Sequence, residues 1–167
     1  MTQKRNKQRR RAGATMIEAV ASMIIVSGAM VAALNAVSAA RASQVMVGER
    51  GQARLLAEAM MNEVLAMDYA EAGTNTIGPD NGEAGTTKRN QYDDVDDFNG
   101  WSNTVSNADG TPIAGFEAYR LSFTVEWVAP AQPGTAVGSD QGVKRVTVTI
   151  LRDGRNVAQL HGWAVAP

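Results

Sequence analysis

A long uncharged segment near the amino terminus constrains this chain more than any other feature. From Ala19 to Ala40, 22 consecutive residues carry no formal charge, and the segment ends at Arg41. As an α-helix rising about 1.5 Å per residue, it is about 33 Å long, enough to cross a hydrocarbon core of roughly 30 Å. Polar side chains within it are few: Ser22, Ser27, Asn35 and Ser38. We therefore expect a membrane-spanning helix or an export signal.

The charges on either side of this segment are unequal. Six of the 16 Lys and Arg residues lie in the first 13 positions, which contain no acidic residue. Residues 14–167 contain the other 10 basic residues and all 17 acidic ones, a formal charge of −7. A basic tip before a long apolar segment is typical of a signal that stays cytoplasmic while the remainder is exported. The remainder has no basic patch, so we expect no nucleic-acid partner.

The chain contains no cysteine. Disulfides, thiolate zinc sites and cysteine nucleophiles are therefore excluded. An exported domain of this composition must be stabilised by its own core or by neighbouring subunits.

Three interpretations of the amino terminus are open. A signal peptidase could cleave after Ala39, since Val37-Ser38-Ala39 matches a small-residue site, but the apolar segment is longer than the usual 7–15 residues. The segment could instead remain as an uncleaved membrane anchor. In the third interpretation, cleavage falls between Gly13 and Ala14 and leaves the apolar segment on the mature protein.

The third interpretation rests on residues 9–18, whose sequence is RRRAGATMIE, followed by the apolar segment. This pattern strongly resembles the class III signal of type IV prepilins and type II secretion pseudopilins. The resemblance implies cleavage by prepilin peptidase between Gly13 and Ala14 and N-methylation of Ala14. It also implies that Glu18 is the family's glutamate at the fifth mature position. Ala14 departs from the large apolar residue usual at the first mature position.

Glu18 has two explanations. Thr15 and Glu18 match a capping box, with the carboxylate near the positive end of the helix dipole. Alternatively, Glu18 pairs with the α-amine of Ala14 on a neighbouring subunit, which would fix the register of an apolar assembly. A carboxylate deep in lipid costs about 2–3 kcal/mol, so its presence favours a partner.

Beyond Arg41 the pattern becomes amphipathic, with apolar residues at three- and four-residue steps. We predict one helix from about Thr15 to about Asp68. The apolar stripe of its second half is expected in the core of a globular domain: Met60, Met61, Val64, Leu65 and Met67.

Residues 69–115 are rich in Gly, Asn, Thr and Asp and are predicted to form a connecting loop. Four aspartates within it are weak candidates for calcium ligands: Asp93, Asp94, Asp96 and Asp97. Their spacing does not match an EF-hand. We favour an acidic, solvated turn without a metal, anchored to the sheet by Tyr92, Phe98 and Trp101. The stretch also resembles a segment of minor pilins of the mannose-sensitive haemagglutinin kind.

The last part of the chain has strand periodicity. Apolar residues alternate with polar ones from Tyr119 to Trp127 and from Val146 to Ile150. Asp153-Gly154 predicts a hairpin turn into a strand over residues 156–165. Residues 129–142 are expected to form a flexible link, giving at least three antiparallel strands.

No catalytic constellation can be assembled. His161 is the single histidine, and the nucleophile, nucleotide-binding and metalloprotease motifs are missing. We predict that the protein is not an enzyme and uses no cofactor; a membrane-tethered hydrolase is the remotest alternative.

These patterns predict an α+β, pilin-like fold: a long N-terminal α-helix, transmembrane in its first half and amphipathic in its second, packed on a small antiparallel β-sheet. The predicted segments are a basic leader (1–13), the transmembrane and assembly half of the helix (14–40), its amphipathic half (41–68), the acidic loop region (69–115) and the sheet (116–167).

The function that the resemblance implies is a structural subunit, expected to be a minor one, of a type IV pilus or type II secretion pseudopilus. The expected partners are other pilin subunits, prepilin peptidase, the inner-membrane assembly platform and membrane lipid. The expected location is the inner membrane, with the amino terminus cytoplasmic, and then the filament. The alternative is an exported binding module, released after Ala39 or held by an uncleaved anchor.

Overall fold

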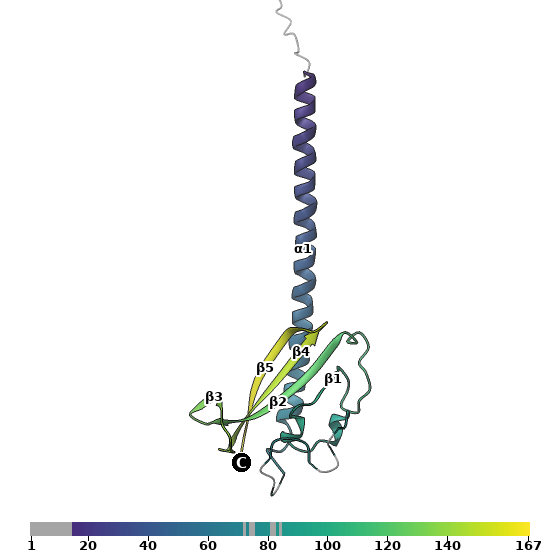
Figure 1. The fold of residues 1–167 in the computed structure, drawn as a ribbon. Coiled ribbons are helices and arrows are strands. Elements are labelled where there is room, and N and C mark those ends of the chain that lie inside the picture. Colours follow the sequence, from purple (N-terminus) through teal and green to yellow (C-terminus); the bar gives the residue numbers. More distant parts are fainter. Residues whose placement is uncertain (1–14, 72, 74–75, 81–82, 84) are drawn as a thin grey trace, which may run out of the picture. The chain divides into compact units, whose positions relative to one another are not determined.

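The computed structural model describes residues 15–71, 73, 76–80, 83 and 85–167. Along the chain come the helix α1 (Met16–Leu65), two short 3₁₀ helices, η1 (Arg89–Gln91) and η2 (Asp96–Phe98), and five strands (Figure 1). The strands are β1 (Ser102–Thr104), β2 (Tyr119–Ala129), β3 (Gln132–Ala136), β4 (Val143–Arg152) and β5 (Arg155–Val165). A long apolar helix and a small antiparallel sheet are therefore present, as predicted.

Helix α1 is continuous over 50 residues. It contains no proline, and Gly48 and Gly51 lie within it without interrupting it. The helix ends three residues before the predicted Asp68. Asp68 instead forms a parallel β-bridge with Asp94, and its carbonyl accepts the N–H of Val95 at 3.0 Å. Asp68 is therefore paired with the loop region and is not part of the helix.

The chain divides into two units, and the boundary falls within α1 after Val45. In the first unit every described residue is exposed. The second unit, Met46–Pro167, contains the remainder of α1 and the sheet. Five residues of this part of the helix are buried: Ala53, Ala57, Met60, Met61 and Val64.

The sheet of the second unit has the strand order β1-β2-β4-β5, with β3 paired to β2 beside this path. All its pairings are antiparallel. The predicted hairpin is present: Asp153 and Gly154 have φ of 49° and 76° and connect the paired residues Arg152 and Arg155. Positive φ at both turn positions is the signature of the type I′ turn that suits twisted hairpins.

The core lies between one face of the sheet and the buried side of α1. Alternate residues of β2 and β4 point into it: Leu121, Phe123, Val125, Val146, Val148 and Ile150. Of the predicted helix stripe, Met60, Met61 and Val64 are buried and Met67 is partly buried, but Leu65 is 39% exposed. The helix approaches β5 closely at Gly162, where an added Cβ would lie 2.6 Å from Met61 Sδ.

Two segments predicted to be loops contain regular structure. Residues 69–115 include η1, η2 and β1, which pairs with β2, so the sheet begins before residue 116. The predicted flexible link contains β3. The predicted anchors Tyr92, Phe98 and Trp101 are all buried in the core.

Candidate assembly helix and buried polar clusters

The start of α1 is organised by Thr15 and Glu18. The Thr15 N–H donates to Glu18 Oε2 at 3.3 Å, and the Glu18 N–H donates to the Thr15 carbonyl at 3.0 Å. Ser22 Oγ donates to the Glu18 carbonyl at 2.7 Å. Glu18 is thus the third residue of the helix, and its carboxylate accepts a hydrogen bond from the Thr15 N–H at the positive end of the helix dipole. Gly13 and Ala14 lie outside the described residues.

The first part of α1 presents apolar side chains to its surroundings. The exposed fraction is 88% for Met16, 71% for Ile25 and 58% for Leu34. The most apolar 18-residue window of the helix has a mean hydropathy of 2.1, and none of it is buried. Length and composition therefore allow this helix to cross a membrane. The same surface would be covered equally well by other apolar helices.

The aspartate stretch is a correction to the sequence analysis, because it is not a solvated turn. Asp94, Asp96 and Asp97 are buried, and only Asp93 is exposed. Asp94 Oδ1 accepts the N–H groups of Asp96 and Asp97 at 2.6 and 3.3 Å, and its Oδ2 accepts the N–H of Glu71 at 2.6 Å. Asp97 Oδ2 accepts the N–H groups of Asp93 and Asp94. These carboxylates satisfy backbone donors that no helix or strand satisfies.

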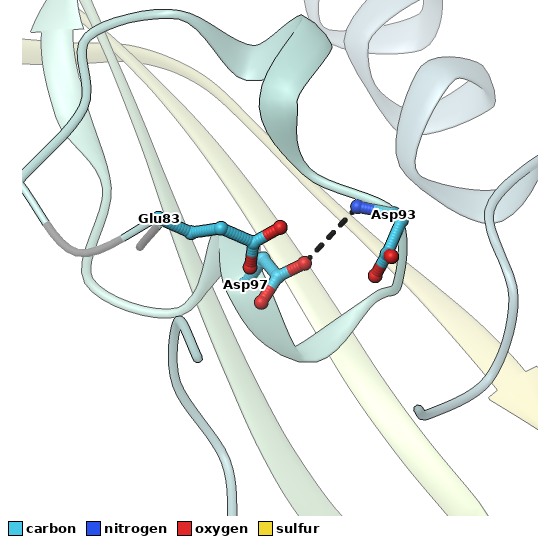
Figure 2. Close-up of side chains that lie close together, drawn as sticks. All are labelled: Glu83, Asp93 and Asp97. Atoms are coloured by element: carbon cyan, nitrogen blue, oxygen red, sulfur yellow. Dashed lines mark hydrogen bonds between the residues drawn. The ribbon is translucent and has the colours of Figure 1, made fainter. Parts of the chain in front are cut away.

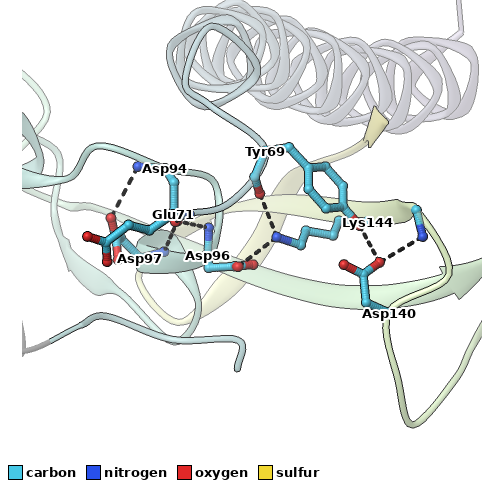
Figure 3. Close-up of polar contacts among 8 residues, drawn as sticks. Tyr69, Glu71, Asp94, Asp96, Asp97, Asp140 and Lys144 are labelled. Atoms are coloured by element: carbon cyan, nitrogen blue, oxygen red, sulfur yellow. Dashed lines mark hydrogen bonds and ion pairs between the residues drawn. The ribbon is translucent and has the colours of Figure 1, made fainter. Parts of the chain in front are cut away.

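Asp96 takes part in a buried ion pair (Figure 3). Its Oδ2 lies 2.6 Å from Lys144 Nζ, and the two side chains are 7% and 1% exposed. Lys144 also donates to the Tyr69 carbonyl and lies 3.9 Å from the centre of the Tyr69 ring. Burial raises the pKa of Asp96 to about 6, against the opposing effect of Lys144. The pair ties η2 to β4 and to the chain just after α1.

The Tyr69 hydroxyl extends this network by donating to Asp140 Oδ1 at 2.5 Å. Desolvation, followed by the hydrogen bond with Asp140, raises the pKa of Tyr69. Asp140 also accepts the N–H of Gly142 at 2.7 Å, which fixes the turn before β4.

Three carboxylates from different parts of the loop region lie close together (Figure 2). Glu83, Asp93 and Asp97 each place one oxygen within 4.8 Å of the others. Of the four sequence candidates for calcium, only Asp93 and Asp97 belong to this group, and Glu83 was not predicted. Burial and a hydrogen bond with Asp97 raise the pKa of Glu83 to about 7. A proton shared between Glu83 and Asp97 would relieve the repulsion between these two carboxylates.

A second buried cation lies between α1 and the loop region. The Arg89 side chain is 0% exposed, and its Nε and Nη2 lie 2.8 and 3.1 Å from the two Glu63 carboxylate oxygens. Nη2 also donates to the Ser106 carbonyl. This bidentate pair fixes η1 against the helix.

The single histidine lies on the outer face of the sheet. His161 is exposed, and its Nδ1 is 2.9 Å from Thr147 Oγ1. Among the described residues no carboxylate is hydrogen-bonded to the ring, so the contact lacks the orienting group of a catalytic triad. A pocket of about 280 Å³ lies elsewhere, lined by residues between positions 79 and 103, and neither His161 nor Thr147 lines it. No reaction is assigned to this pair.

Comparisons with models of protein families, with curated proteins and with solved structures find no match. A function can therefore be proposed for this chain only from its own sequence and structure.

Proposed function

We propose that the chain is a structural subunit of a type IV pilus or type II secretion pseudopilus, assembled through the first part of α1. The observation that carries the proposal is the change in surface along one continuous helix. Apolar side chains are exposed from Met16 to Val45, whereas the later part is buried on one side against the sheet. A helix of this kind can leave lipid and pack among equivalent helices while its domain stays folded.

Glu18 gives this assembly its register in the proposal. Among the residues that the structure describes, its carboxylate accepts one hydrogen bond, from Thr15, and it remains exposed. A carboxylate can accept several bonds, so one from the α-amine of Ala14 on a neighbouring subunit is compatible with this contact. The pair would satisfy two charges in an apolar environment. Removing one partner of a buried pair costs roughly 3–5 kcal/mol.

Processing and location follow from the same proposal. Prepilin peptidase removes residues 1–13 on the cytoplasmic side, and the methyl group is added to Ala14. The processed subunit is anchored in the inner membrane, with its sheet domain on the outer side, until the assembly platform transfers it to the filament. The similarity of the aspartate stretch to minor pilins favours a minor subunit.

The experiment is incorporation of Glu18→Ala into filaments in cells that contain the peptidase and assembly machinery. We expect cleavage to continue and incorporation to fall at least tenfold, because the buried amine loses its partner. Glu58→Ala, which removes an exposed carboxylate of the same helix, is the matched control. Normal incorporation of Glu18→Ala would exclude the assembly role.

The alternative is an exported binding module released after Ala39. Helix α1 continues through this residue without a break. Cell fractionation distinguishes the two functions, because cleavage after Ala39 would give a soluble domain that begins near Ala40.

A further inference from the structure

Strand β5 forms one end of the strand order, so one of its long edges has no neighbouring strand. The N–H of Ala166 donates to the Gly142 carbonyl at 3.0 Å, next to the last pair of the β4–β5 register. Hydrogen-bonded pairs alternate along an antiparallel ladder. The backbone groups that point away from β4 therefore belong to Gln159, His161, Trp163 and Val165. Among the residues that the structure describes, none hydrogen-bonds to these outward groups.

The composition of this edge does not protect it from pairing. From residue 156 to residue 165 there is no Lys, Arg, Asp, Glu or Pro. Soluble proteins usually protect long edges with such residues or with a covering segment. The edge over residues 156–165, which lacks this protection, is a template for an added strand.

A groove follows the helix side of this edge within the unit Met46–Pro167. It consists of two adjoining pockets of about 230 and 270 Å³, which share Arg50 and Val157. Residues of α1 from Met46 to Arg54 form one wall, and residues of β5 from Arg155 to Leu160 form the other.

The groove carries positive charge that the described residues do not neutralise. Arg50 and Arg155 are exposed, and neither has an ion pair in the described part of the chain. Glu49 lies in the same wall, but its Oε1 is 2.6 Å from Arg152 Nη1 and forms an ion pair with that residue. Arg54 is paired with Glu58, but this pair is largely exposed.

We propose that the β5 edge binds an extended segment of another protein that carries carboxylates at alternate positions. Backbone bonds to the outward groups would add the segment as a strand. Because side chains alternate across a sheet, every second residue of the segment would face the helix side, and those beside residues 155–160 would lie at the groove, near Arg50 and Arg155. The residues between them would lie beside Gln159, His161 and Trp163 on the outer face.

A second copy of this chain does not supply such a segment from its described edges. The strands with a free edge are β1, β3 and β5, and none contains Asp or Glu. The partner is therefore a different chain. The proposal concerns the sheet domain and does not rest on the filament function.

The test uses a fluorescent peptide of alternating glutamate and valine and the full chain in mild detergent. Binding is followed by anisotropy, and hydrogen exchange reports protection of the β5 amides. Arg50→Glu with Arg155→Glu reverses the groove charge, and Arg120→Glu, at an exposed arginine of β2, is the matched control. Gln159→Pro removes an outward N–H and keeps the backbone bonds to β4, although it also removes the side-chain bond from Gln159 Nε2 to Thr149 Oγ1 at 3.3 Å. Proline is tolerated at such edge positions.

We expect the peptide to bind and to protect the outward amides of β5. The double reversal should weaken binding about tenfold, because like charges would then face one another. Gln159→Pro, and a peptide N-methylated at alternate residues, should also bind at least tenfold less, whereas Arg120→Glu should bind normally.

Absence of binding, or binding unaffected by the double reversal and by Gln159→Pro, would overturn the proposal. It would be overturned equally if phosphatidylglycerol vesicles, and not the peptide, bound through Arg50 and Arg155. Self-association lost in Gln159→Pro would identify a second copy as the occupant and would also contradict it.

Discussion

Replacing Lys144 with methionine tests how the buried ion pair stabilises the sheet domain. Methionine keeps most of the length and the apolar packing of the side chain but removes its charge. Asp96, 7% exposed, then lacks its cation, and the Tyr69 carbonyl loses a donor. Removing one partner of a buried pair typically costs about 3–5 kcal/mol. We expect a loss of that size in the free energy of unfolding near pH 8.

The loss should become smaller in acid. Burial already raises the pKa of Asp96 to about 6, and loss of Lys144 would raise it further. A carboxyl whose pKa is higher in the folded state stabilises the fold below its unfolded pKa, and this contribution is lost as the pH rises through the folded pKa. Near pH 5 the variant carboxyl would be protonated, and most of the penalty would disappear.

The assay is urea unfolding of the full chain in mild detergent, followed by tryptophan fluorescence, since Trp101 lies in the core. Arg54→Met is the control, because it breaks a surface pair worth about 0.3–0.5 kcal/mol. Adding Asp96→Asn to Lys144→Met should restore part of the stability, since no buried charge then remains. A pH-independent loss below about 1 kcal/mol for Lys144→Met would refute the reasoning.

Two further predictions concern close packing and titration. Gly162→Ala should lower the free energy of unfolding by about 1–3 kcal/mol, because the new methyl group would meet Met61, whereas Gly134→Ala, with nothing within 4 Å, should change it little. Stability should decrease as the pH rises through about 7, since Glu83 holds a proton in the folded state that it releases on unfolding. Unfolding curves for Glu83→Gln, measured with a chelator present, should show a weaker pH dependence; an unchanged dependence would contradict the shared proton with Asp97.

The elements with strong local signals could be predicted from the sequence. The uninterrupted apolar and then amphipathic pattern gave α1, and period-two alternation gave β2 and β4. Asp153-Gly154 gave the hairpin, because only a few residue types adopt positive φ at both turn positions. The core face of the helix followed from the spacing of Met60, Met61 and Val64.

The burial of the acidic stretch could not be predicted from the sequence, because it depends on partners that are distant along the chain. Four aspartates in five positions favour solvation by composition alone. The cation that compensates Asp96 is Lys144, 48 residues away, and Arg89 is held by Glu63, 26 residues away. No local pattern connects such residues. Short strands such as β3, with sequence QPGTA, likewise carry little signal of their own.

The amino terminus of the mature protein tests the proposed function most directly. Intact mass and N-terminal sequencing should be carried out on the membrane-extracted chain from cells that contain prepilin peptidase. We expect a chain that begins at Ala14, with or without an added methyl group, and retains the whole of α1. A soluble product beginning near Ala40 would contradict it and would favour the exported binding module.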